Sequence, residues 1–174
     1  RIALGTFANA GQMCVCPDYL LVHASVKDKL IGYIKESTAA FYTNDPSEAY
    51  GYGRIINEKR FDKLVSYLSQ GDIVLGGQYN RSTLYIAPTI LENVSLDAPV
   101  MQEEIFGPIL PVFTFNRDEE AIEIINRNPN PLSFYIFTGS HKKEESWIEK
   151  IQFGAGCVNN AAWHFSNHHL PFGG

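Results

Sequence analysis

Apolar residues along the chain follow two patterns, short continuous runs and stripes with helical spacing. The short runs are typical of buried strands and cover residues 19–23, 73–75, 109–113, 133–137 and 156–159. The helical stripes lie between these runs and predict helices from the N-terminus to about residue 9, then over 26–42, 57–71, 118–125 and 144–151. This alternation predicts an α/β layered domain with a mostly parallel sheet.

Some element ends carry their own sequence signals. Asn57 can cap a helix that Gly71 then closes, and the apolar stripe of that helix is Phe61, Leu64, Val65 and Leu68. Residues 84–91 form a further extended run. Because proline has no backbone N–H for a sheet, Pro88 places this run at an edge or a bend.

Composition narrows the class of protein. The 174 residues are 45% hydrophobic, which is enough for one substantial core, so we expect a single domain. The formal net charge of −5, without a lysine or arginine stripe, excludes nucleic-acid binding. No apolar run reaches the ~20 residues that cross a bilayer, and the N-terminus lacks the zones of a signal peptide, so we expect a cytoplasmic protein. The chain begins as if a helix were already under way, and we expect a piece of a larger protein.

Cys14 is the foremost candidate for chemistry. The chain has three cysteines, Cys14, Cys16 and Cys157, and an odd number without a secretory signal predicts free thiols. Cys14 follows a helix–glycine junction, where backbone N–H groups can lower a thiol pKa and stabilise an oxyanion. A buried thiol acting as a small apolar side chain is the alternative. Cys16 precedes a proline, and we interpret it as a structural thiol or a redox neighbour.

The cysteines and histidines allow two other interpretations, a metal site and a hydrolase site. The spacing of Cys14 and Cys16 and of the C-terminal histidines matches no common zinc signature, so we expect no metal site. His164 could activate Cys14 in a cysteine-dependent hydrolase acting on activated esters.

A loop over residues 103–108 offers paired glutamates beside an aromatic ring. Both glutamates could be solvated and Phe106 could be a core residue. A carboxylate there can also accept hydrogen bonds from ribose hydroxyls while the ring packs on a nicotinamide. Gly51 and Gly53 are too few for a dinucleotide fingerprint, so a pyrophosphate site must lie elsewhere.

Three segments together resemble the aldehyde dehydrogenase superfamily, and the resemblance spans essentially the whole chain. They are Asn-Ala-Gly-Gln-Met-Cys at residues 9–14, Gln-Glu-Glu-Ile-Phe-Gly-Pro at 102–108 and Leu-Pro-Phe-Gly-Gly at 170–174. Ala-Pro-Thr at residues 87–89 and Pro-Asp-Tyr at 17–19 are most similar to the class 3 branch.

The resemblance implies a three-layer α/β/α catalytic domain covering residues 1–174, with the dinucleotide-binding domain absent from this chain. It also implies NAD(P)-dependent oxidation of aldehydes to carboxylic acids through a cysteine thiohemiacetal and thioester. Cys14 matches the family nucleophile, Glu104 the residue that binds the nicotinamide-side ribose, and Phe106 the aromatic residue beside the nicotinamide. Asn159 matches a family asparagine near the substrate site and His164 a class 3 histidine.

The resemblance has further consequences. The general base and the main NAD or NADP cradle lie upstream of Arg1, so the chain alone is expected to be inactive. The full-length protein is expected to form a homo-oligomer with an aldehyde as its substrate. An inactive structural or assembly domain and an esterase-like fragment remain the alternatives.

Overall fold

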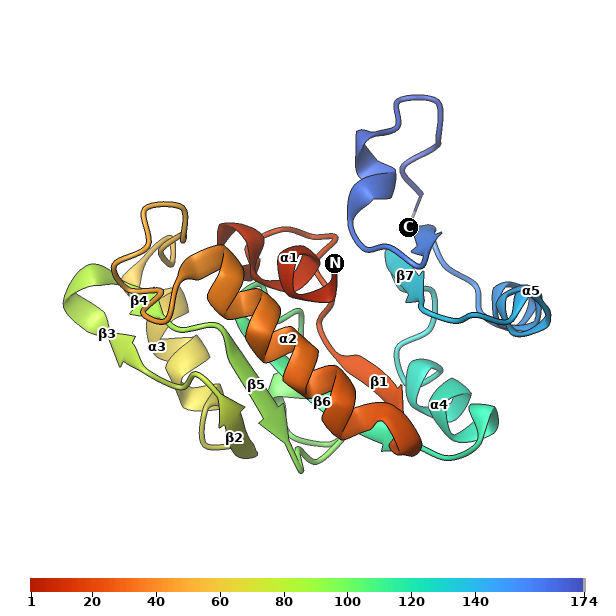
Figure 1. Cartoon of the computed structure of the whole chain (residues 1–174), viewed down its shortest axis with the longest axis horizontal. Coiled ribbons are helices and arrows are strands. Elements are labelled where there is room, and N and C mark those ends of the chain that lie inside the picture. Colours follow the sequence, from red (N-terminus) through yellow and green to blue (C-terminus); the bar gives the residue numbers. More distant parts are fainter. Residues whose placement is uncertain (174) are drawn as a thin grey trace.

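A four-stranded sheet forms the centre of the fold, with strand order β1-β6-β5-β2 (Figure 1). The structure is a computed structural model that describes residues 1–173. The strands are β1 (Leu20–His23), β2 (Asp72–Leu75), β5 (Thr89–Glu92) and β6 (Ile109–Phe115). Strands β1 and β5 run parallel to β6, whereas β2 runs antiparallel to β5 at the edge. A minor antiparallel pair is formed by β3 (Tyr79–Asn80) and β4 (Tyr85–Ile86).

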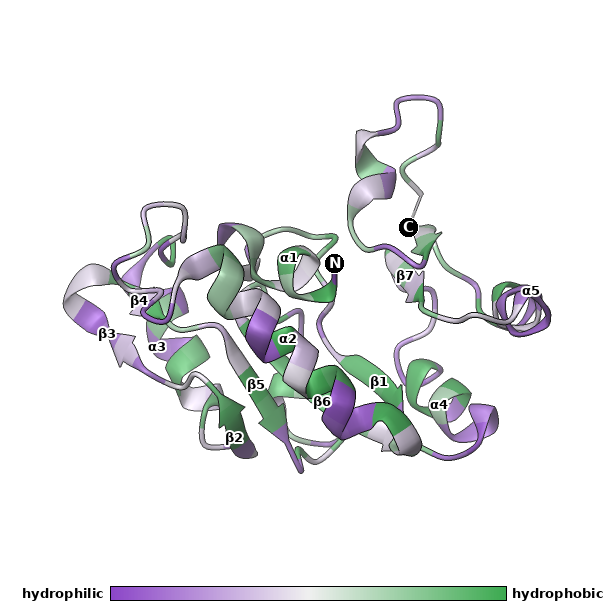
Figure 2. Ribbon diagram, in the orientation of Figure 1, coloured by the Kyte–Doolittle hydropathy of each residue, from purple (hydrophilic) through white to green (hydrophobic). Residues whose placement is uncertain are grey.

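Both faces of this sheet are covered. Ile90 and Leu91 are neighbours in β5 and therefore face opposite sides, yet both are fully buried. The covering helices are α1 (Ile2–Phe7), α2 (Lys27–Tyr42) and α3 (Glu58–Tyr67). Figure 1 shows α2 crossing in front of the sheet, and Figure 2 shows the strands of the central sheet mostly in green, the hydrophobic colour. The predicted α/β layered fold is confirmed. Its buried core includes Phe7, Ile31, Ile34, Phe61, Leu64, Tyr67, Ile109 and Leu110.

The C-terminal third forms a separate parallel strand pair. Strands β7 (Ser133–Ile136) and β8 (Ala155–Val158) pair with each other and, within residues 1–173, with no strand of the central sheet. Helix α4 (Asp118–Ile125) precedes them, and α5 (His141–Lys150) connects them. Most strand pairs are thus parallel, as predicted. The strands form separate sheets, however, because β1 at the edge of the central sheet does not pair with β7. Short 3-10 turns complete the chain at Ala8–Gly11 (η1), Ala24–Val26 (η2), Arg81–Thr83 (η3), Pro99–Met101 (η4) and Trp163–Ser166 (η5).

Most predicted ends are confirmed, and two are wrong. The Asn57 side chain caps α3 by accepting from the Arg60 N–H at 2.9 Å, but Gly71 does not close this helix, which already ends at Tyr67. The predicted bend at Pro88 is confirmed, because the run 84–91 is divided there into β4 and β5, and the Pro88 carbonyl packs tightly against Gly76. The helix predicted from residue 144 begins at His141, because Ser140 caps it. No helix in the described part of the chain is both long and apolar enough to span a bilayer.

Candidate active site

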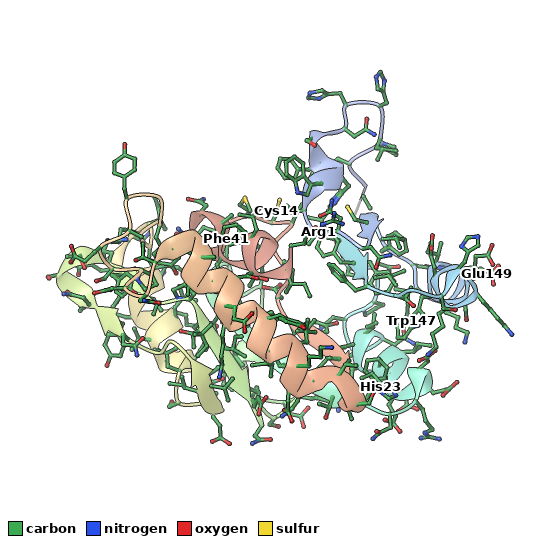
Figure 3. All side chains as sticks on the ribbon, in the orientation of Figure 1. Arg1, Cys14, His23, Phe41, Trp147 and Glu149 are labelled. Carbon is green, nitrogen blue, oxygen red and sulfur yellow. The ribbon has the colours of Figure 1, made fainter. Side chains whose placement is uncertain are left out.

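Cys14 sits in a tight turn that exposes its side chain. The turn spans Met13 to Cys16 and is closed by the Cys16 N–H, which donates to the Met13 carbonyl at 3.0 Å. Cys14 is exposed while Val15, the next residue, is 3% exposed. Among the hydrogen bonds of residues 1–173, none uses the backbone N–H of Cys14. In Figure 3, Cys14 lies beside α1 on the side toward β7. The turn therefore offers an exposed thiol and, among the described residues, a backbone N–H without a protein acceptor.

The segment before this turn has an unusual backbone. Asn9, Ala10 and Gly11 are all left-handed, with φ of 51°, 53° and 71°. A Cβ at Gly11 would lie 2.2 Å from the carbonyl oxygen of Gly107, so only glycine fits there. Consecutive left-handed residues cost free energy and concentrate at functional sites. The close approach of Gly11 to Gly107 also packs two segments together. They are the nucleophile segment, residues 9–18, and the glutamate loop, residues 103–108.

Side-chain hydrogen bonds fix both ends of the nucleophile segment. Gln12 donates from Nε2 to the Arg54 carbonyl at 2.9 Å, and its Oε1 accepts from the Ile56 N–H at 3.0 Å. Asp18 accepts from the Ile105 N–H at 3.0 Å, a bond to the glutamate loop. The role of Asp18 could not be predicted from the sequence, because its partner lies 87 positions away.

The two glutamates of the glutamate loop have different surroundings. Glu103 pairs with Lys63 Nζ at 2.7 Å and accepts from the Tyr67 hydroxyl, and both partners belong to α3. These partners lower the pKa of Glu103. Glu104 is exposed, and within residues 1–173 its carboxylate forms no ion pair. Glu104 thus has the carboxylate open to a ligand.

Arg60 of α3 holds the backbone of the glutamate loop. Its guanidinium donates to the Glu104 carbonyl at 2.8 Å and also to the Ile105 carbonyl. Phe106 follows with a left-handed φ of 46° and a ring that is 36% exposed. Sequence reasoning missed Arg60, since a lone arginine in a helical stripe gives no motif. Its two bonds leave Glu104 and Phe106 projecting from a fixed loop.

Cys14 and Glu104 line the same cleft. This cleft measures about 830 Å³ and lies between the edges of β1 and β7. Its lining also includes the apolar residues Phe115 and Trp147. The structure thus brings the predicted nucleophile and the predicted ribose-binding carboxylate together. Phe106, Asn159 and His164 are not part of the cleft wall.

Burial raises the pKa of two groups near the turn, the Cys16 thiol and the Asp18 carboxyl group. It raises the pKa of the Cys16 thiol to about 12, so Cys16 stays protonated near neutral pH. Burial also raises the pKa of Asp18 to about 6, although the Ile105 N–H opposes this shift. A protonated thiol is a poor nucleophile. Of the two neighbouring cysteines, Cys14 is therefore the one suited to react.

Asn159 and His164 both engage other protein groups. The Asn159 amide accepts from the Thr138 N–H and donates to the Thr138 carbonyl, each at 2.9 Å. His164 is 7% exposed, and its Nδ1 lies 3.9 Å from the Cys157 sulfur. Burial lowers the pKa of His164, which favours the neutral ring. Both residues brace the region around β7 and β8.

Tyr135 is a site neighbour that the sequence analysis did not single out. Its hydroxyl donates to the Val15 carbonyl at 2.7 Å, inside the Cys14 turn. The signal was present, because a tyrosine in a predicted strand usually finds a hydrogen-bond partner for its hydroxyl. The partner could not be read from sequence, since it lies 120 positions away.

Comparisons with known proteins agree with this geometry. The model of the aldehyde dehydrogenase family matches residues 1–174. The chain is 45% identical to 4,4'-diaponeurosporen-aldehyde dehydrogenase of Staphylococcus aureus, covering 100% of this chain and 38% of that protein. It is 41% identical to human aldehyde dehydrogenase family 3 member B1, covering 100% of this chain and 37% of the human protein.

The fold matches solved structures as well. The substrate-bound state of Staphylococcus aureus AldH superposes with a TM-score of 0.97 at 44% identity, covering 100% of this chain and 38% of that one. The chain thus spans well under half the length of these relatives. The resemblance to the superfamily and its class 3 branch is confirmed. The chain belongs to the aldehyde dehydrogenase family.

Proposed function

We propose that this chain is the catalytic, cysteine-bearing domain of an NAD(P)-dependent aldehyde dehydrogenase that oxidises aldehydes to carboxylic acids. The observation that carries the proposal is an exposed Cys14, in a turn with an unused backbone N–H, on the same cleft as Glu104. The chain spans 38% of its Staphylococcus aureus relative, so the activity is that of the whole protein. The main dinucleotide-binding domain lies outside residues 1–174 in this proposal.

Cys14 provides the covalent chemistry. Its thiolate adds to the aldehyde carbonyl, forming a C–S bond and placing negative charge on the oxygen. The Cys14 backbone N–H donates to that oxygen, which stabilises the thiohemiacetal. After oxidation the acyl group stays on the Cys14 sulfur as a thioester. Hydrolysis then releases the carboxylic acid and restores the thiol.

The glutamate loop suits one end of the cofactor. The exposed Glu104 carboxylate can accept hydrogen bonds from ribose hydroxyls, and the exposed Phe106 ring can pack on a nicotinamide. When bound, NAD or NADP supplies the acceptor for the hydride that the aldehyde loses. Arg60 holds the loop so that Glu104 keeps its position relative to Cys14.

Asn159 and His164 act on the substrate side of the site through the elements they brace. Asn159 fixes the end of β7 through Thr138, and His164 packs on Tyr135 with ring centroids 5.7 Å apart. The homo-oligomer and the cytoplasmic location expected from the sequence stay predictions.

The test compares two cysteine variants of the intact protein on a panel of aldehydes, with NAD(P)H formation as the readout. Cys14→Ala is expected to fall to the uncatalysed background. Cys16→Ala, its matched control two residues away, is expected to keep activity within about threefold, because the half-buried thiol of Cys16 takes no part. The 174-residue chain alone is expected to show no turnover. Unchanged NAD(P)H formation by Cys14→Ala would overturn the proposal.

A further inference from the structure

Tyr135 reaches from β7 to the turn that carries Cys14. Its hydroxyl donates to the Val15 carbonyl at 2.7 Å, and Val15 directly follows Cys14. Because β7 pairs only with β8 among the described strands, this bond ties the C-terminal strand pair to the nucleophile segment. A long-range contact at this point can set the geometry of the site.

The bonded carbonyl belongs to the centre of the turn. Cys14 and Val15 are the two central residues of the turn from Met13 to Cys16, and one backbone hydrogen bond closes it. The dihedral angles of the two central residues set where each N–H in the turn points. The Val15 carbonyl shares a peptide plane with the Cys16 N–H, and the Met13 carbonyl that accepts from this N–H shares a peptide plane with the Cys14 N–H. Holding the Val15 carbonyl therefore restricts the direction of the Cys14 N–H through the hydrogen bond that closes the turn.

The Tyr135 ring is supported by a second aromatic ring. It packs on the His164 ring with centroids 5.7 Å apart, and His164 Nδ1 lies 3.9 Å from the Cys157 sulfur. Burial raises the pKa of Tyr135, so its hydroxyl keeps its proton and remains a donor. Tyr135 is thus a supported side chain whose hydroxyl donates to the nucleophile segment.

We propose that Tyr135 is a positioning residue that holds the Val15 carbonyl and thereby aims the Cys14 backbone N–H at the oxygen of the reacting carbonyl. This rests on the proposed role of Cys14 as the nucleophile. Tyr135 touches neither the aldehyde nor the cofactor in this role. It acts on the oxyanion through the backbone of the turn.

The proposal separates two reactions of the same thiol. In acylation by p-nitrophenyl acetate, the Cys14 sulfur bonds to the carbonyl carbon, an oxyanion forms, and p-nitrophenolate leaves as the C–O bond breaks. In alkylation by iodoacetamide, the sulfur bonds to the methylene carbon and iodide leaves, without an oxyanion. Only acylation needs the aimed N–H. Neither reaction needs NAD(P).

The experiment measures both rates at Cys14 in the intact protein, with Cys14→Ala as the blank. In Tyr135→Phe, which keeps the ring against His164, the acylation rate is expected to fall ~tenfold while the alkylation rate stays within about twofold. The control Tyr33→Phe removes a hydroxyl from a tyrosine of α2 that is 54% exposed, and it is expected to change neither rate.

Two outcomes would overturn the inference. Unchanged acylation in Tyr135→Phe would show that the hydroxyl does not aim the donor. A parallel fall of acylation and alkylation would show general loosening of the turn instead of positioning. The proposed function fails differently: the wild-type protein would then form no NAD(P)H with any aldehyde, while both rates at Cys14 could still be compared.

Discussion

The amide N–H of Ile105 donates to the Asp18 carboxylate at 3.0 Å and joins the glutamate loop to the nucleophile segment. The Asp18 residue is half-buried, and this burial raises the pKa of its carboxyl group from 3.8 to about 6. Glu104 raises this pKa further and Arg60 lowers it, so the shift belongs to the junction of both segments. One hydrogen bond at the site is therefore linked to pH.

We expect Asp18→Asn to remove a pH dependence of stability. The folded state holds the Asp18 proton more tightly than the unfolded chain, so this contribution is complete below about pH 4 and is lost as pH rises through about 6. The loss is roughly 3 kcal/mol for a shift of this size. Asparagine is neutral and still accepts from Ile105. Urea unfolding between about pH 4 and 7 should show a flatter curve for the variant, whereas the exposed control Asp28→Asn should parallel the wild type.

We expect Gly11→Ala and Gly32→Ala to have opposite effects on stability. A Cβ at Gly11 meets the Gly107 carbonyl at 2.2 Å, and its φ of 71° suits only glycine, so the free energy of unfolding should fall by about 2 kcal/mol or more. Gly32 lies inside α2 with nothing within 4 Å of its added Cβ, so the variant should gain up to about 1 kcal/mol. Equal urea midpoints for the two variants would contradict this.

We expect iodoacetamide to label the cysteines of the turn unequally. The pKa of about 12 leaves about one Cys16 in ten thousand as thiolate at pH 8, whereas Cys14 is exposed. Mass spectrometry of the native protein should find the label on Cys14, and labelling of Cys16 should require urea. Equal labelling of both cysteines in the native protein would show that Cys16 is not sequestered.

We expect Arg60→Gln to weaken cofactor binding without changing the reactivity of the Cys14 thiol. The variant loses the bond to the Glu104 carbonyl at 2.8 Å, so KM for NAD(P) should rise ~tenfold while acylation of Cys14 by p-nitrophenyl acetate stays within about twofold. The control Arg81→Gln should leave KM unchanged, because Arg81 pairs at the surface with Asp62 and Glu58. A KM that does not respond to Arg60→Gln would remove Arg60 from the cofactor side.

Elements with strong local signals could be predicted from the sequence, and long-range contacts could not. The helix that begins after Asn57 and the strands near residues 73 and 109 follow from capping and apolar runs within a few residues. The partners of Tyr135 and Asp18 lie 120 and 87 positions away, so no local pattern points to them.

The separation of β7 and β8 from the central sheet could not be predicted from the sequence either. Apolar runs identify β1 and β7 as strands but do not say which strands pair, because pairing depends on tertiary packing. The run 84–91 shows it on a smaller scale. Pro88 indicated an edge or a bend, but the close approach of its carbonyl to Gly76 was needed to divide the run into two strands.

The unpaired edges of β1 and β7 make aggregation a concern when these residues are prepared alone. Within residues 1–173, each strand has a partner on one side only, and their free edges border an apolar cleft. Unpaired strand edges beside apolar surface add strands from other molecules and aggregate. Preparations of these residues by themselves would therefore need low protein concentration. If the chain is one domain of a longer enzyme, as we propose, preparations of that whole protein are the better starting point for crystals and kinetics.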